Sequence, residues 1–316
     1  MDRYTIVRTL RDAIYGKVVL ARCNESKKDE LVAIKMMSLV QLHSRKGLRI
    51  GLNIKEDGLQ EFAILKELTP HPSLLHLLDH FEHENMLCLV SVYCPYGELL
   101  DQINCPNKMT TRGLDEAMAA KWFKQITQGL LHIHNSGIAH RDLSLENVLI
   151  DQQQHCRICD FGLATQHGEN AKGRVGKLFY MAPEVYLGDQ QSYNGFAADI
   201  WSLGIMLFIL VSGLPPLEIP GEKDRRFRII RQEGIRVLVK MWGVRVSNRV
   251  LDLISQLLKV QPDERLSLEL VLQHPWLAPD NNNNVEESSS RHSITSDSLH
   301  DSKGKSAFED NQTCVG

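Results

Sequence analysis

The sequence has no apolar run long enough to cross a membrane and no strong excess of charge of either sign. Its most apolar segment, Ile200 to Leu214, is shorter than the roughly 20 residues of a spanning helix and is followed by Pro215 and Pro216. The first residues, Met1 to Tyr4, contain no apolar signal core. A formal net charge of -3 gives no reason to expect a nucleic-acid binder. We therefore expect a chain without a membrane span, in which segment 200–214 forms a buried helix.

The sequence also lacks a cysteine pattern that would indicate a disulfide framework. The number of cysteines is odd and they are scattered, which suits a reducing compartment. We expect a cytoplasmic location, with the nucleus as an additional one. His155, Cys156 and Cys159 resemble half of a zinc site, but no second Cys or His pair is spaced to complete it. We interpret Cys156 and Cys159 as thiols of a strand.

The length and the hydrophobic fraction of 43% exceed what one compact core usually holds, so two lobes are expected. Alternating or short apolar runs predict strands over 4–10, 18–22, 31–37 and 86–92. Helical spacing predicts a helix over 59–68 between the last two. Residues 1–93 are thus predicted to be a small strand-rich lobe with one main helix.

Helical spacing dominates the second part of the chain. Apolar residues recur every three or four positions from Met118 to Ile133, and Gly137 can end this helix. Ser267 can cap a short later helix. Residues 94–278 are predicted to be a mainly helical lobe, so the fold class is α+β. Residues 279–316 are polar with few apolar anchors and are predicted to be a disordered tail.

The segment from His140 to Asn147 carries the strongest functional signal. Asp142 and Asn147 lie five apart in a run without helical spacing, and Asp160 follows at the start of Asp-Phe-Gly. Three such oxygen-bearing groups suit a Mg²⁺-phosphate complex and a hydroxyl that loses its proton. The two segments resemble the catalytic and metal-binding loops of the eukaryotic protein kinase superfamily, here with a variant catalytic loop.

The resemblance implies a bilobal fold, Mg-ATP as phosphate donor and a role for each matching residue. Lys35, in Val-Ala-Ile-Lys, would hold the α- and β-phosphates, and Glu61 would be its partner. Asp142 would orient the acceptor hydroxyl, while Asn147 and Asp160 would ligate Mg²⁺. The residues expected around the nucleotide are Leu10, Gly16, Val18, Ala33, Lys35, Ser91, Val92, Tyr93, Cys94, Glu98, Leu149 and Asp160.

Further landmarks follow from the same resemblance. Glu184, in Ala-Pro-Glu, would close the activation segment and pair with Arg265. Asp199 would bond the backbone of the catalytic loop. The distance in sequence from Lys35 to Glu61 is longer than the family usually has, so an insertion at 43–57 is expected to form an extended loop.

The loop that would cover the nucleotide departs from the family pattern. Where three glycines are expected, the chain has Arg11, Ala13 and Gly16. Glycine lets backbone amides approach phosphate closely. The loop is therefore expected to hold ATP less tightly, with the charge of Arg11 as partial compensation.

Two further departures fall in the catalytic machinery. Ser144 stands where serine/threonine kinases usually have a lysine, and Lys177 stands where they usually have a threonine. We hypothesise an exchange, in which the ammonium of Lys177 occupies the place left by the catalytic-loop lysine and Ser144 supplies the hydroxyl. Two unrelated surface changes are the alternative.

The activation segment is short of phosphorylation sites. Arg141 before Asp142 usually indicates control by a phosphate in this family. Between Gly162 and Ala182, however, the hydroxyl residues are Thr165 and Tyr180. Either Glu169 pairs with Arg141 as a fixed negative charge, or no such switch exists. In both cases we predict activity without phosphorylation of the activation segment.

The catalytic loop lacks the sequence typical of tyrosine kinases, so a protein substrate with a serine or threonine acceptor is expected. Glu98 and Glu146 match positions that contact upstream arginines in basophilic relatives, which suggests basic substrate sites; both are alternatively solvated charges. A pseudokinase that binds nucleotide or partners without efficient catalysis is the competing interpretation. The sequence gives no indication of oligomeric state.

Overall fold

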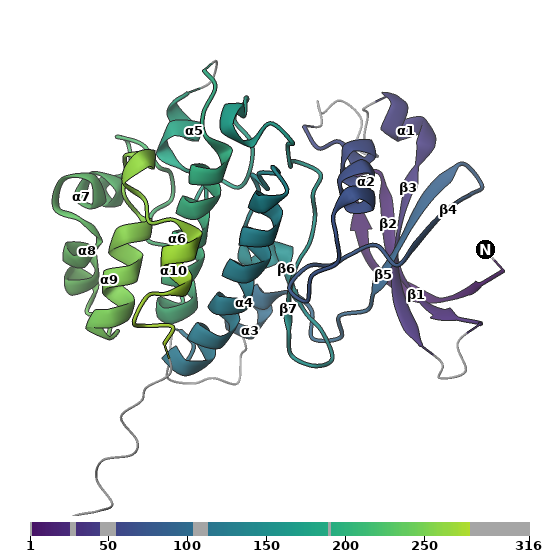
Figure 1. Cartoon of the computed structure of the whole chain (residues 1–316), viewed down its shortest axis with the longest axis horizontal. Helices are drawn as coiled ribbons and strands as arrows, with labels where there is room; N and C mark the ends of the chain where they lie inside the picture. The colour runs from purple at the N-terminus through teal and green to yellow at the C-terminus, as the bar shows by residue number, and fades with distance from the viewer. Residues whose placement is uncertain (1, 26–29, 45–54, 104–112, 189–190, 279–316) are drawn as a thin grey trace, which may run out of the picture. The chain divides into compact units, whose positions relative to one another are not determined.

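The computed structural model describes the chain except residues 1, 26–29, 45–54, 104–112, 189–190 and 279–316. Figure 1 shows an antiparallel sheet with helix α2 beside it, followed by a mainly helical part. The predicted α+β architecture with a strand-rich N-terminal part and a helical C-terminal part is confirmed.

The N-terminal sheet has five strands in the order β1-β2-β3-β5-β4. Alternation along β3 buries Val32, Ile34 and Met36 in an apolar cluster on one face. Ala33 and Lys35 consequently point to the other face, which is turned to the rest of the chain. The strands are β1 (Tyr4–Ala13), β2 (Gly16–Cys23), β3 (Leu31–Ser38), β4 (Asp79–His83) and β5 (Met86–Val92).

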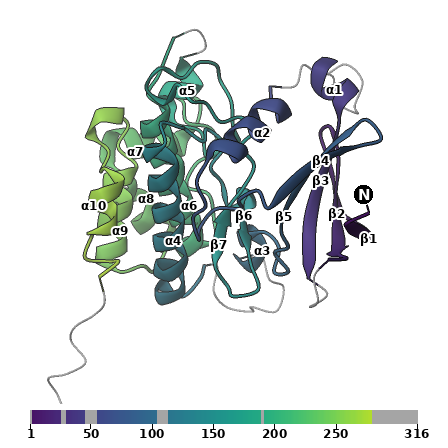
Figure 2. The ribbon, with the colours of Figure 1, turned by 45° about the vertical axis from the view of Figure 1, so that its right-hand side comes forward.

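Helix α2 (Gly58–Glu67) lies between the sheet and the helical part in both ribbon views (Figures 1 and 2). Asp57 caps it, since its side chain accepts hydrogen bonds from the backbone N–H groups of Leu59 and Gln60 at 3.1 Å. The helix buries Glu61 and Ile64. The cap and the buried side chains fix which residue of α2 faces Lys35.

The helical part is built around α4 (Glu116–Asn135) and α6 (Gly195–Ser212). Helix α6 has the length and composition of a membrane span, but 89% of its apolar window is buried inside the protein, in agreement with the buried helix predicted there. Gly137 follows α4 with a φ of +75°, as expected for a residue that ends a helix. The other elements are α3 (Leu99–Ile103), β6 (Val148–Ile150), β7 (Cys156–Ile158), α5 (Pro183–Leu187), α7 (Arg225–Glu233), α8 (Ile235–Trp242), α9 (Asn248–Leu257) and α10 (Leu268–Leu272).

Two elements of the N-terminal part depart from the sequence-based prediction. Strand β4 and the short helix α1 (Leu39–Ser44) were not predicted. Helix α1 takes up the start of the expected loop 43–57. Residues 45–54 of that loop and the predicted tail 279–316 lie outside the described part of the chain.

Cys156 lies in β7 and Cys159 directly after it, which agrees with their interpretation as strand thiols.

Candidate active site

Lys35 and Glu61 form the expected ion pair between β3 and α2. The Lys35 Nζ lies 2.8 Å from Glu61 Oε1 and 2.6 Å from Oε2. Burial alone would lower the pKa of Lys35, but the charges of Glu61 and Asp160 outweigh it and raise the pKa above its ordinary value. The ammonium therefore stays charged and aimed into the space between sheet and helices.

Asp160 brings a carboxylate from the helical part to this pair. Its Oδ1 lies 3.8 Å from Lys35 Nζ. Burial would raise the pKa of Asp160, but the neighbouring charges of Lys35 and then His140 hold it below the usual range. Phe161 next to it is fully buried in the main apolar core, which anchors the loop. An ionised oxygen ligand thus lies beside the lysine, as a magnesium-phosphate site requires.

Asp199, near the start of α6, binds the backbone of the catalytic loop. Its Oδ2 accepts from the backbone N of His140 at 2.7 Å and its Oδ1 from the backbone N of Arg141 at 2.8 Å. Arg141 adopts a φ of +63°, the left-handed region that non-glycine residues rarely occupy. These two bonds stabilise that conformation and so set the direction in which Asp142 leaves the loop.

Asp142 and Asn147 face each other across the loop. The Asn147 Nδ2 donates to the Asp142 carbonyl and to Oδ2, both at 2.8 Å. With Nδ2 so engaged, the amide oxygen is the atom of Asn147 that would ligate a metal. Lys177 reaches the same place from the activation segment, with Nζ 3.0 Å from Asp142 Oδ2 and 3.0 Å from Ser144 Oγ. The two residues of the hypothesised exchange are therefore in direct contact.

A cavity of about 360 Å³ lies between the sheet and the helical part. Val18 and Ala33 line it from the sheet and Leu149 from the other side, an apolar sandwich that suits a flat aromatic base. Sequence reasoning missed several lining residues because nothing in their type indicates a ligand. The predicted residues that line the cavity are Leu10, Val18, Ala33, Lys35, Ser91, Val92, Tyr93, Cys94, Glu98, Leu149 and Asp160, and the unpredicted ones include Leu75, Pro95, Gly97, Asp101 and Cys159.

Gly16, also predicted near the nucleotide, is not among the residues that line this cavity. It starts β2, and a Cβ added there would lie 2.1 Å from the carbonyl oxygen of Met36. The close approach of β2 to β3 therefore explains why this position is glycine. Arg11 does line the cavity, and its Nη1 forms an ion pair with Glu98 Oε1 at 3.1 Å.

The activation segment holds Arg141 through backbone carbonyls. The Arg141 Nε donates to the carbonyl of Leu163 at 2.7 Å and its Nη1 to the carbonyl of Lys172 at 2.8 Å. Among the described residues the expected partner Glu169 forms no ion pair with it. Backbone carbonyls accept the hydrogen bonds of the Arg141 guanidinium because the activation segment runs directly past it.

Glu184 and Arg265 form the expected pair where the activation segment ends. The two guanidinium nitrogens Nη1 and Nη2 donate to Glu184 Oε1 at 2.6 Å and Oε2 at 2.7 Å. A forked pair of this kind fixes orientation as well as distance.

One polar residue at the site, Glu56, was not named in the sequence analysis, and the contact that Tyr180 makes was not predicted. Burial raises the pKa of Glu56 to about 7, with the charge of Asp160 as the next cause, and its Cβ and Cγ lie beside Gly162. Glu56 belongs to the insertion, where no family pattern applies. Tyr180 donates from its hydroxyl to Glu146 Oε2 at 3.0 Å, so Glu146 already has a partner within the chain.

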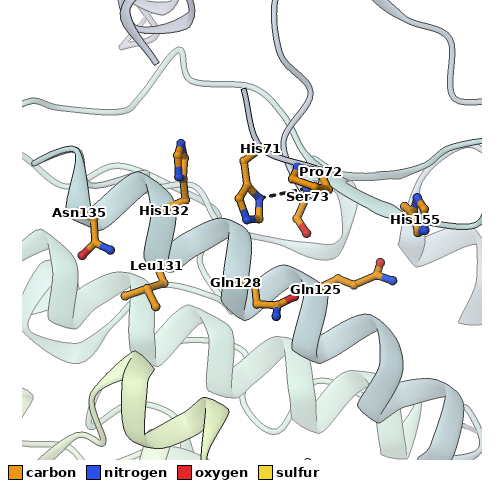
Figure 3. A pocket seen from close by; sticks show the side chains of 9 residues that line it. All are labelled: His71, Pro72, Ser73, Gln125, Gln128, Leu131, His132, Asn135 and His155. Atoms are coloured by element: carbon orange, nitrogen blue, oxygen red, sulfur yellow. Dashed lines mark hydrogen bonds between the residues drawn. The ribbon is translucent and has the colours of Figure 1, made fainter. Parts of the chain in front are cut away.

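A second hollow of about 580 Å³ lies along α4, away from the predicted site residues (Figure 3). The rings of His71 and His132 stack in it with centroids 5.0 Å apart. The His71 Nδ1 accepts from the backbone N of Ser73 at 3.1 Å, and His132 Nε2 lies 2.9 Å from the carbonyl of Thr69. These histidines thus join the chain before β4 to α4.

The comparisons with known proteins agree with this geometry. The family model described as the protein kinase domain matches residues 4–277. Serine/threonine-protein kinase PLK4 of Drosophila willistoni is 34% identical over 281 residues, which make up 88% of this chain and 33% of that protein. The PLK4 protein of Drosophila sechellia is 35% identical over 280 residues, with the same two shares. The chain spans about a third of the length of these curated relatives, and it belongs to the protein kinase family.

Proposed function

We propose that the chain transfers the γ-phosphate of Mg-ATP to a serine or threonine hydroxyl of a protein. The observation that carries this proposal is the meeting of Lys35, Glu61 and Asp160 at the wall of one cavity. They come from β3, α2 and the loop after β7. A scaffold has no evident need for these three charges to be kept together.

The residues present fit both ATP and Mg²⁺. Val18, Ala33 and Leu149 offer an apolar slot for adenine, and the charge of Lys35 suits phosphate oxygens. The carboxylate of Asp160 and the amide oxygen of Asn147 are hard ligands of the kind that Mg²⁺ prefers. A bound Mg²⁺ would supply positive charge next to the phosphates.

Asp142 would orient the acceptor hydroxyl and take up its proton. Its carboxylate is held by donors from Asn147 and Lys177, so its direction is fixed before a substrate arrives. Phosphoryl transfer depends mainly on such positioning and on opposite charge. Glu98 and Glu146 are engaged by Arg11 and Tyr180, so a basic substrate side chain would compete with these contacts.

The test is turnover of a randomised peptide library with Mg-ATP, comparing the wild type with Asp142→Asn. We expect phosphate on serine or threonine, loss of about a hundredfold or more in rate for Asp142→Asn, and nucleotide binding retained in both. Chelation of Mg²⁺ is expected to abolish turnover.

A pseudokinase is the second candidate, favoured by Arg11 and Ala13 in place of glycines and by Ser144 in place of lysine. Nucleotide binding by a wild-type protein that phosphorylates no peptide would establish that reading and overturn ours.

A further inference from the structure

Lys177 contacts Asp142 twice, although the two residues are 35 positions apart in the chain. Its backbone N donates to Asp142 Oδ1 at 3.2 Å, and its Nζ donates to Oδ2 at 3.0 Å. The same ammonium donates to Ser144 Oγ at 3.0 Å. One lysine therefore joins the activation segment to two residues of the catalytic loop, Asp142 and Ser144.

The backbone on both sides fixes this arrangement. Gly176 has a φ of +91°, and a Cβ there would lie 2.6 Å from the carbonyl oxygen of Arg141. A glycine allows the segment to pass this close to the catalytic loop. Ser144 is fully buried between the buried residues Leu143 and Leu145, so its hydroxyl has a defined place. The position of the ammonium is thus set by folded backbone on both sides of the contact.

The Lys177 side chain is not fully enclosed by these contacts. It is 34% exposed, compared with 14% for the side chain of Asp142. An ammonium has three N–H donors, and Asp142 and Ser144 take two of them. A charged donor fixed beside the reacting atoms stabilises negative charge that develops during a reaction.

We propose that Lys177 provides the positive charge that faces the transferred phosphoryl group, and that Ser144 is the positioning residue that holds it. This inference rests on the proposed phosphotransfer. In that reaction the acceptor oxygen bonds to the γ-phosphorus while the bond from phosphorus to the ADP oxygen breaks. The hydroxyl proton passes to Asp142, and Lys177 stays protonated throughout. The activation segment thus supplies the positive charge that position 144 of the catalytic loop lacks.

The first test separates catalysis from structure. Lys177→Thr is expected to lower kcat about a hundredfold, while the KM for ATP and the melting temperature of the nucleotide-free protein change little. Lys177→Arg keeps the charge and is expected to lose less. Lys223→Thr removes an exposed lysine elsewhere on the helical part and serves as the matched control. Equal rates for Lys177→Thr and Lys223→Thr would overturn the proposal, as would a faster Lys177→Thr enzyme, because Lys177 would then mask Asp142.

The second test uses the exchange itself. Ser144→Lys alone places two ammonium groups next to each other and is expected to lower both kcat and the melting temperature. The double variant Ser144→Lys with Lys177→Thr is expected to be at least tenfold faster than the slower single variant and to regain the melting temperature lost by Ser144→Lys. A double variant no better than the slower single one refutes the inference. An inactive wild type would instead refute the proposed phosphotransfer, so the two failures are distinguishable.

Discussion

Arg11 lines the cavity that we propose for the nucleotide, at a position where the family usually has glycine. Its ion pair with Glu98 joins β1 to the segment after β5, and the two side chains are 48% and 30% exposed. Pairs with this exposure contribute about 0.2 to 1 kcal/mol. The contact is therefore weak enough for a nucleotide to displace, while the guanidinium remains close to where phosphates would lie.

We predict that Arg11→Ala raises the KM for ATP about two- to fivefold and leaves kcat unchanged, because a charge that binds substrate and transition state alike affects binding alone. The effect should shrink at high salt, since the pair is exposed. Steady-state kinetics at two ionic strengths measure both. Arg8→Ala, on the same strand but outside the cavity lining, is the control, and an equal KM for the two variants would show that Arg11 does not act on the nucleotide.

Single residues were predictable where their chemistry is tied to a motif. Short sequence motifs contain Lys35, Asp142 and Asp160, and the chemistry requires these residue types. The motifs were therefore enough to predict that these residues belong to the site. Glu56 was not predictable, because an ordinary glutamate gains its raised pKa through burial beside Gly162. The partner of Arg141 was also missed, since backbone carbonyls leave no trace in the sequence.

The activation segment is fastened along its length by backbone contacts. Ala171 and Tyr193 exchange two hydrogen bonds of 2.9 Å, and Thr165 and Ala139 exchange two more of 2.9 Å. At its start, the carbonyl of Gly162 accepts from the backbone N of Asp57 at 2.8 Å, which ties the segment to the cap of α2. All of these contacts are backbone hydrogen bonds, so none of them depends on a side chain that would bind a phosphate.

We predict that the fully dephosphorylated protein keeps its activity within about twofold, because Arg141 already has carbonyl partners. Intact-mass spectrometry establishes the absence of phosphate, and peptide turnover gives the rate. Arg141→Met should lower activity in that dephosphorylated protein by leaving two carbonyls without donors, whereas Thr165→Ala should not. A tenfold loss on dephosphorylation that is recovered with phospho-Thr165 would contradict this prediction.

At the scale of elements, strands and helices with a clear apolar period were predicted to within a few residues, and β5 was predicted at its observed bounds. Strand β4 was missed because Asp79 to His83 is mostly polar, with Phe81 as its one apolar residue, so no apolar period marks it. Helix α1 was missed because its six residues are too few to show a helical period.

In the folded molecule, Arg265 joins segments that are far apart in sequence. All five of its N–H donors are used, by both carboxylate oxygens of Glu184 and by the carbonyls of Ala197, Lys259 and Val260. Its side chain is 0% exposed, and its guanidinium lies over the Trp201 ring at 5.3 Å. The end of the activation segment is thereby fixed to α6 and to the segment after α9.

We predict that Arg265→Met lowers the free energy of unfolding by about 3 to 5 kcal/mol, because removing one partner leaves the largely buried Glu184 carboxylate and three carbonyls unsatisfied. Urea unfolding measures the loss. Arg236→Met is the matched control, because it breaks an ion pair with Asp252 at a similar distance of 3.0 Å. Both side chains of that pair are 49% exposed, so its loss should lower the free energy of unfolding by less than about 1 kcal/mol.

Nucleotide affinity should persist in Arg265→Met, because Lys35 and Glu61 lie in the other part of the molecule. The KM for the peptide should rise as the activation segment loosens. Equal unfolding losses for the two variants would mean that the activation segment is held by contacts other than this pair.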